Sequence, residues 1–330
     1  MILHPAIIAL LVSSILVTAM VLLALWFGVR ILRHWDLRSG SSLQLDLERR
    51  TYLISTILAY AFGFQLISLF LLVYTADSIS PLFTGAMCAA GTFNVNGFGY
   101  PLLLLKVVNF LLAGLWLIMN HADNQAYDYP LVKKKYGLLM IVAPLVVLET
   151  VLQALYFQGL HPDIITSCCG SLFSTSSATI TSHIVSLPEA PLRIAFTAVI
   201  VTTGVLGWAF IVTGRGGYAF SLAASATFVT GMASLLSFIS PAVYELPTHH
   251  CPFCVLQREY GYIGYFFFAA LFGGAVSGMG IGLLMPFLRL PSLTNILPAM
   301  QKRLAVVSLA FTVTLALITA YILLFSNLKQ

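Results

Sequence analysis

The run His249-His250-Cys251-Pro252-Phe253-Cys254 gathers two imidazoles and two thiols in one short stretch. Two cysteines at this spacing can form a reversible disulfide, while His and Cys side chains are also ligands that proteins offer to Zn²⁺ and Cu(I). Pro252 suits the first position of a helix, where its missing N–H would have no partner anyway. The spacing therefore predicts Cys251 at a helix N-terminus, where free N–H groups and the helix dipole favour an exposed thiolate.

Arg258 follows Cys254 at a spacing of four residues, which places both on one face if the helix continues. A guanidinium beside the second sulfur, close to a bilayer, could hold an electron-rich acceptor. Two thiols, an arginine and a membrane together suggest a quinone as cofactor.

The pattern Cys251-x-x-Cys254-x-x-Gln257-Arg258 closes one apolar span and opens the next. Over about residues 220–290 it resembles the first cysteine motif of the bacterial disulfide bond formation protein B family. The resemblance implies a redox-active pair, Cys251 and Cys254, that takes electrons from a periplasmic thiol protein to a membrane quinone, with Gln257 and Arg258 on the cofactor side. It also implies a second cysteine pair.

No cysteine follows Cys254, so a second catalytic pair must come from Cys168 and Cys169, or from one of them with Cys88. Adjacent cysteines form only a strained, easily reduced ring, so Cys168 and Cys169 are expected to bond elsewhere or to bind a soft metal. Because five cysteines is an odd number, at least one thiol stays outside any disulfide within the chain. Cys88 is isolated and is expected to be a packed small side chain.

Two other functions remain open. His249, His250, Cys251 and Cys254 supply enough ligands for a Zn or Cu site in a metal-binding or metal-transport protein, although consecutive residues rarely reach one ion together. One of the two histidines is then expected to point away. Alternatively, the chain is a non-enzymatic membrane subunit in which disulfides brace the loops.

The composition excludes a soluble globular protein, because 59% of the residues are hydrophobic and only 8% are charged. We expect an all-α polytopic membrane helix bundle, a single integral domain over residues 1–330. Its apolar stretches are long enough to cross a bilayer as helices. They lie at about 6–33, 52–76, 101–120, 137–158, 191–213, 219–240, 260–288 and 304–326.

The basic residues predict the orientation of these eight spans. The first span lacks a basic segment before it and is followed by arginines, so it is expected to be a retained helix with its amino end outside. Twelve of the sixteen basic residues then fall inside, both termini lie outside, and all cysteines lie in outer loops. The inner ones are Arg30, Arg33, Arg38, Arg49, Arg50, Lys133, Lys134, Lys135, Arg215, Arg289, Lys302 and Arg303.

This orientation indicates a bacterial inner membrane with the cysteine loops facing the periplasm or the exterior. The net charge of +5 is then explained by topology, so no nucleic acid is expected as a partner. The expected partners are membrane lipid, the periplasmic thiol protein and other membrane subunits.

Lys106 and Glu149 are the only ionisable residues that we expect deep inside the bilayer, and such charges need a partner or a cavity. We predict that they pair, either to fix helix register or to line a proton route or cofactor pocket near the thiols. In the seventh span, Gly274, Gly278 and Gly282 recur every fourth residue. This spacing predicts close packing against a neighbouring helix.

Overall fold

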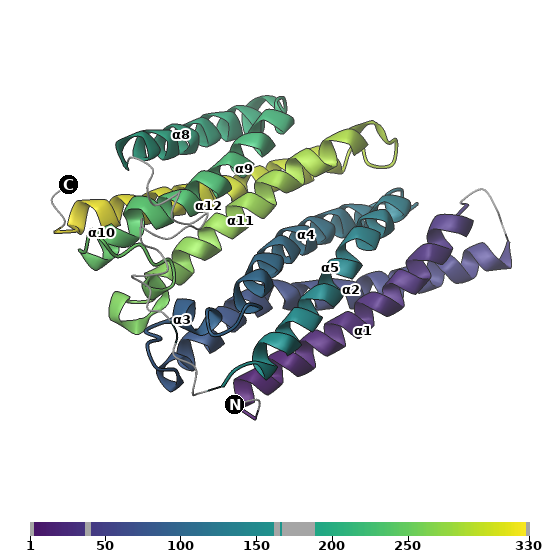
Figure 1. Cartoon of the computed structure of the whole chain (residues 1–330). Coiled ribbons are helices and arrows are strands. Elements are labelled where there is room, and N and C mark those ends of the chain that lie inside the picture. Colours follow the sequence, from purple (N-terminus) through teal and green to yellow (C-terminus); the bar gives the residue numbers. More distant parts are fainter. Residues whose placement is uncertain (1–2, 37–40, 162–165, 167–188, 328–330) are drawn as a thin grey trace. The chain divides into compact units, whose positions relative to one another are not determined.

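The computed structural model describes residues 3–36, 41–161, 166 and 189–327 (Figure 1). This part of the chain is helical and contains no strand, and eight of its helices are long and apolar enough to cross a membrane. The prediction of an all-α, multi-pass membrane bundle is confirmed. The main helices are α1 (Pro5–His34), α2 (Ser42–Ser78), α4 (Gly99–Gln125), α5 (Val132–Gln158), α8 (Glu189–Thr213), α9 (Gly217–Ser234), α11 (Ile263–Leu284) and α12 (Leu297–Phe325).

Short elements join these helices. They are the 3₁₀ turns η1 (Ser80–Leu82), η3 (Cys254–Leu256), η4 (Arg258–Tyr260) and η5 (Met285–Arg289), the π turn η2 (Leu235–Ile239), and the helices α3 (Ala89–Phe93) and α10 (Ser240–Tyr244).

The residues group into two compact units. Unit 1 comprises Met1–Val73, Asn96–His161 and Pro286–Met300, and unit 2 comprises Tyr74–Val95, Pro162–Met285 and Gln301–Gln330. That the whole chain acts as one integral domain stays a prediction.

In unit 1, α5 packs against both α1 and α4. The largest side chain of its core is Trp116, which meets Phe62 edge to face with the ring centroids 5.0 Å apart. The Trp116 Nε1–H donates to the Lys135 carbonyl at 3.0 Å, so the indole both fills the core and satisfies its polar atom. This contact ties α4 to α5.

The hairpin between α4 and α5 corrects one expectation. Lys135 was expected in an inner loop at 121–136, but it is a fully buried helix residue whose Nζ lies 2.7 Å from Asp123 Oδ2. Asn120 Oδ1 also accepts from this amine at 3.0 Å. Lys135 and Asp123 thus form a second buried ion pair, because an apolar window stops at the first charged residues while a paired charge lets the helices continue. That Lys106 and Glu149 alone lie deep inside the bilayer stays a prediction.

Two further helices also begin well before their apolar stretches. α2 begins at Ser42 where the sequence predicts a span from about 52, and α12 begins at Leu297 where it predicts one from about 304. Helix hydrogen bonds form within the segment whatever solvent surrounds them. Hydropathy therefore predicts the apolar part of each helix and does not predict the polar turns that precede it.

In unit 2, α9 packs between α8 and α11. The predicted role of the glycines in α11 is confirmed for two of the three: a Cβ at Gly278 would collide with Ala224, and a Cβ at Gly282 would collide with Ser221, whereas one at Gly274 would make only an ordinary contact with Phe311. The absence of these two side chains lets α11 approach α9 closely.

α9 continues through the π turn η2 into α10, and the change coincides with Pro241. Proline has no N–H and its ring clashes with the carbonyl four residues earlier, so a regular α-helix cannot pass through it unchanged. A π turn is one way for a helix to adapt, and such turns release carbonyls for other donors. Here the Leu236 carbonyl is bonded to His250 Nδ1 at 2.9 Å.

Candidate functional site

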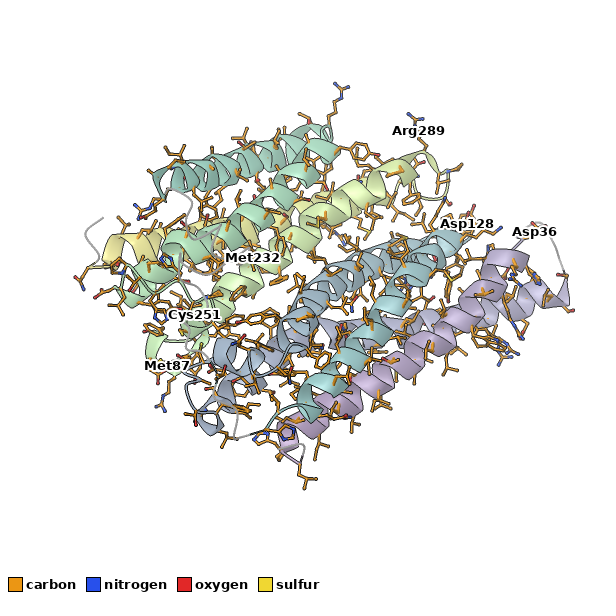
Figure 2. The ribbon with its side chains drawn as sticks, in the orientation of Figure 1. Asp36, Met87, Asp128, Met232, Cys251 and Arg289 are labelled. Carbon is orange, nitrogen blue, oxygen red and sulfur yellow. The ribbon has the colours of Figure 1, made fainter. Side chains whose placement is uncertain are left out.

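The cysteines of unit 2 that the structure describes converge on one point. The Sγ atoms of Cys88, Cys251 and Cys254 all lie within 4.8 Å of one another, and those of Cys88 and Cys251 are 3.6 Å apart. The three residues are 0%, 0% and 5% exposed. Cys88 precedes α3 and the other two lie between α10 and α11, so tertiary structure brings them together (Figure 2 labels Cys251).

This cluster corrects two expectations. Cys88 is buried as predicted, but it is not isolated, because it contacts Cys251. Cys251 was expected to be an exposed helix N-cap with Pro252 as the first helical residue; instead it is buried, and the next long helix begins only at Ile263. A sequence rule for proline at helix starts could not reveal that the chain makes two short 3₁₀ turns first.

The segment that carries Cys251 and Cys254 is held by its backbone. The Tyr244 hydroxyl donates to the Cys251 carbonyl at 2.5 Å, and the Gln257 N–H donates to the Cys254 carbonyl at 3.0 Å. Phe253 packs its ring against Phe93 of α3 with centroids 5.8 Å apart. These contacts hold the backbone from which both sulfurs project.

Gly264 explains why this segment can lie so close to α11. A Cβ built on Gly264 would stand 2.6 Å from Val255 Cγ2 and 2.9 Å from its carbonyl carbon. Only glycine, in the first turn of α11, leaves room for the residue that follows Cys254.

Asp77 and Gln257 join the two loops that carry the thiols. Asp77 Oδ1 accepts from the Ala89 N–H at 3.2 Å and from Gln257 Nε2 at 3.1 Å, and Gln257 Nε2 also donates to the Met87 carbonyl at 2.9 Å (Figure 2 labels Met87). The residues on both sides of Cys88 are therefore tied to the loop of Cys254. Sequence reasoning missed Asp77, although a carboxylate at the end of an apolar span is a recognisable signal.

Gln257 and Arg258 occupy different surroundings. Gln257 was expected on the cofactor side, and its amide is engaged in this clamp. Arg258 is exposed and lies on the separate turn η4, so the prediction that it shares a helix face with Cys254 is wrong. A quinone role for either residue stays a prediction.

The two histidines face different groups. The His250 ring contacts the Leu236 carbonyl through Nδ1, as described above. The His249 ring stands edge-on against Tyr244 with centroids 4.5 Å apart, and its Nε2 is buried without a hydrogen-bond partner in the described part of the chain.

Burial lowers the pKa of His249, and a charged His250 acts in the same direction, whereas a Cys88 thiolate raises this pKa. Burial also raises the pKa of Tyr260, with the negative charges of Cys254 and Glu259 adding to the effect.

The predicted pair of Lys106 and Glu149 is confirmed in unit 1. Lys106 Nζ lies 2.6 Å from Glu149 Oε1 and donates to Ser68 Oγ at 3.1 Å. Glu149 Oε2 accepts from Gln65 Nε2 at 2.5 Å and from Asn109 Nδ2 at 2.6 Å. The partners from α2, α4 and α5 satisfy both charges, so their role towards a cofactor stays a prediction.

Cys168 and Cys169 lie outside the described residues. Thr166, which is described, lies against the Cys88 loop: its N–H donates to the Thr84 carbonyl at 3.0 Å and its hydroxyl to the Gly91 carbonyl at 2.9 Å. The expected participation of Cys168 and Cys169 stays a prediction.

Compared with models of protein families, with curated proteins and with solved structures, this chain matches none of them. Its function has to be inferred from the chemistry of the site.

Three sulfurs at these distances suit one soft metal ion. An ion held by three thiolates at about 2.3 Å keeps their sulfurs about 4 Å apart. The Cys88–Cys251 distance of 3.6 Å already approaches this value, and the whole set spans no more than 4.8 Å. Movements of less than about 1 Å would bring the donor set to the geometry of a bound ion.

Proposed function

We propose that this multi-pass membrane protein binds a thiophilic metal ion of the Zn²⁺ or Cu(I) class through Cys88, Cys251 and Cys254. The observation that carries the proposal is the convergence of three buried sulfurs from two distant loops. A structural disulfide needs only two sulfurs and leaves the third without a role. Thiolates are the ligands that select such ions over Mg²⁺ or Ca²⁺.

Burial supports this function over direct exchange with a soluble thiol protein. Thiol–disulfide exchange needs access to the attacked sulfur, and Cys88 and Cys251 are fully buried. A closed metal site has the opposite requirement, since exclusion of water stabilises thiolate coordination. The hydrogen bonds of Tyr244, Asp77 and Gln257 fix the loops in the manner expected around metal ligands.

Metal content measured on the full-length protein tests the proposal. After purification in detergent with a thiol reductant and dialysis against Zn²⁺, the wild-type protein should retain about one ion per chain. The variants Cys88→Ser, Cys251→Ser and Cys254→Ser should each lose most of it. The double variant Cys168→Ser/Cys169→Ser is the matched control for the loss of thiols elsewhere.

Equal metal content in the wild type and in a variant lacking all three clustered cysteines would overturn the proposal. The proposal would also be overturned if the three single variants kept their metal and the Cys168→Ser/Cys169→Ser control lost it, because the ion would then bind at Cys168 and Cys169.

A thiol–disulfide redox function is the second candidate, favoured by the 3.6 Å between Cys88 Sγ and Cys251 Sγ. A disulfide requires sulfurs about 2 Å apart, so a small shift would join them. The Cys251 sulfur lies within 4.8 Å of both other sulfurs. A disulfide between Cys88 and Cys251 could therefore exchange into one between Cys251 and Cys254. In this reaction two thiols form an S–S bond, and their two electrons and two protons reduce a membrane quinone to its quinol.

This candidate includes the resemblance to the disulfide bond formation protein B family, with Arg258 on the quinone side and a periplasmic thiol protein as donor. Thiols trapped with a bulky maleimide before and after addition of a soluble quinone test it. Loss of two reactive thiols per chain, abolished by Cys251→Ser, is the expected result. Thiols that remain reduced with quinone and become unreactive only with Zn²⁺ would contradict it.

We also propose that the cysteine loops face the periplasm or exterior of a bacterial inner membrane. The support is the basic charge on the opposite loops. Cysteines introduced at the exposed positions Glu259 and Arg215 provide the test with a membrane-impermeant maleimide. Glu259→Cys should label in intact cells and Arg215→Cys only after permeabilisation, and the reverse pattern would contradict this orientation.

A further inference from the structure

The thiol cluster formed by Cys88, Cys251 and Cys254 has ligands of one kind. Their three sulfurs lie within 4.8 Å of one another, and no His, Asp or Glu of the described residues adds a ligand atom to this group. The ring of His250 contacts the Leu236 carbonyl through Nδ1 instead. Within the described part of the chain, the cluster therefore offers an ion three soft sulfur donors and no imidazole or carboxylate.

The surroundings of the three sulfurs are apolar and closed to solvent. Cys88 and Cys251 are fully buried, and Cys254 is 5% exposed. The residues that follow Cys88 and Cys254 are also buried and apolar, and they are Ala89, Ala90, Val255 and Leu256. An ion at this place is therefore shielded from water, which is the usual source of a further ligand.

The polar side chains that contact the cysteine loops are engaged with the backbone or with one another. Tyr244 donates its hydroxyl hydrogen to the Cys251 carbonyl. Asp77 Oδ1 accepts from the Ala89 N–H and from Gln257 Nε2, which also donates to the Met87 carbonyl. These contacts position the loops and leave the sulfurs as the atoms that can bind an ion.

Zn²⁺ and Cu(I) differ in the number of ligands that they need. Zn²⁺ in proteins is almost always four-coordinate, and where the protein supplies three ligands, a water or a substrate takes the fourth position. Cu(I) carries a single charge and a filled d shell, and soft thiolates satisfy it with two or three ligands. A closed site with three sulfurs thus satisfies Cu(I) and leaves Zn²⁺ one ligand short.

We propose that the ion bound by this protein is Cu(I), held in three-coordinate geometry by Cys88, Cys251 and Cys254. This inference rests on the proposed metal-binding function and narrows it to one ion. The oxidation state of copper does not change on binding, and each thiol that becomes a ligand releases its proton to solvent. Zn²⁺ occupies the same sulfurs only with a fourth ligand from outside this set, so it remains a probe of the site and binds less tightly.

Competition between the two ions in the full-length protein tests this inference. Wild-type protein in detergent, loaded with about one Zn²⁺ per chain under reducing and oxygen-free conditions, should release its zinc when an equimolar amount of Cu(I) is added as the acetonitrile complex. X-ray absorption at the copper edge should then show three sulfur neighbours and no nitrogen or oxygen neighbour. At the zinc edge, the Zn²⁺-loaded protein should show three sulfurs and one lighter neighbour.

Single serine variants identify the three sulfurs. Cys88→Ser, Cys251→Ser and Cys254→Ser should each leave copper with two sulfur neighbours. Each should also bind Cu(I) at least about tenfold more weakly in competition with a Cu(I) chelator, because loss of a direct ligand costs more than loss of a residue that only orients one. Three separate variants keep the test decisive if one of them does not fold. Cys168→Ser/Cys169→Ser is the matched control and should keep three sulfur neighbours.

Zn²⁺ that stays bound in the presence of equimolar Cu(I), or a fourth neighbour at the copper edge, would overturn this inference alone. Loss of a sulfur neighbour in the Cys168→Ser/Cys169→Ser protein would overturn it too. Wild-type protein that binds neither ion would overturn the proposed function as well.

Discussion

The protein buries two clusters of functional side chains, one in each unit, and these clusters differ in how far hydrogen bonds and opposite charges within the protein satisfy them. In unit 1, the Glu149 carboxylate receives hydrogen bonds from Lys106, Gln65 and Asn109. In unit 2, the sulfurs of Cys88, Cys251 and Cys254 converge within 4.8 Å of one another. The Glu149 carboxylate is satisfied by side chains of the chain itself, although Asn109 Oδ1 has no hydrogen-bond partner among the described residues, and the second group has the donor set of the proposed metal site.

The difference is the one expected between a structural role in unit 1 and the proposed binding role in unit 2. Ionised groups withdrawn from water are stabilised only when hydrogen bonds and opposite charge replace the solvent, and the pair of Lys106 and Glu149 meets both conditions. Thiols need no such compensation, because cysteine behaves as a small apolar side chain when buried. Burial alone therefore does not require three of them to converge, and this convergence is the observation on which the proposed metal site rests.

The largest expected effect is on the unit 1 network. Lys106→Met removes the cation and leaves the Glu149 carboxylate buried, which should lower the free energy of unfolding by about 3–5 kcal/mol. Thermal unfolding in detergent measures it. Lys106→Met/Glu149→Gln should recover part of the loss, and Arg50→Met, at the exposed pair with Asp46, should cost less than about 1 kcal/mol.

Zn²⁺ affinity of Lys106→Met tests the comparison itself. If the network is structural, the folded variant should bind Zn²⁺ as the wild type does. A folded Lys106→Met protein that has lost zinc would contradict the separation of roles between the two groups.

The next effect is ligand-dependent stability. Zn²⁺ at a free concentration of a thousand times its dissociation constant should stabilise the wild type by about 4 kcal/mol, because an ion that binds only the folded state shifts unfolding by mass action. Denaturant unfolding with and without a chelator measures this. A variant with Ser at positions 88, 251 and 254 should show no difference, and an equal shift in that variant would mean that the ion binds elsewhere.

The sequence predicts the helical spans and the buried ion pair of Lys106 and Glu149, because each has few physical alternatives in a bilayer. Long apolar stretches in a lipid bilayer can only be helices, and the charges of Lys106 and Glu149 needed each other once both were placed in the bilayer. Asp123 and Lys135 escaped this reasoning because they lie at the ends of apolar stretches, where a charge could equally well face water.

The site could be predicted only in part, because its members meet through tertiary contacts. The Cys251-x-x-Cys254 spacing is visible in the sequence, but Cys88 is separated from Cys251 by 163 residues and reaches it through the clamp of Asp77 and Gln257. The sequence also predicts that one of two adjacent histidines points away. Among the described residues, neither histidine contributes an atom to the group of ligand atoms formed by the three sulfurs. His250 instead contacts the Leu236 carbonyl at a π turn that no propensity rule predicts.

A smaller effect is expected where the thiol loop meets α11. Gly264→Ala places a methyl group against Val255 and should cost about 1–3 kcal/mol by overpacking, with weaker Zn²⁺ binding because the displaced segment carries Cys254. Gly63→Ala in α2 is the matched control, since a Cβ there would meet nothing within 4 Å. It should be neutral or stabilising by up to about 1 kcal/mol. Zinc affinity and unfolding midpoints of both variants provide the measurement, and equal zinc affinities would contradict the proposed positioning role of Gly264.

The smallest effect on stability gives the sharpest comparison, because each unit contains a glutamine that donates to a carboxylate. Gln257→Ala removes the bonds to Asp77 and the Met87 carbonyl, and Gln65→Ala removes the bond to Glu149. Each should cost about 1–2 kcal/mol of unfolding free energy, the usual cost of one lost side-chain partner.

Only Gln257→Ala should weaken Zn²⁺ binding, by about tenfold or more, since residues that orient metal ligands typically contribute that much affinity. Titration of both variants with Zn²⁺ in competition with a chelator measures the contrast. Equal affinities would mean that the sulfurs keep their positions without the clamp, so that Asp77 and Gln257 serve the fold of unit 2 in the same way as Gln65 serves that of unit 1.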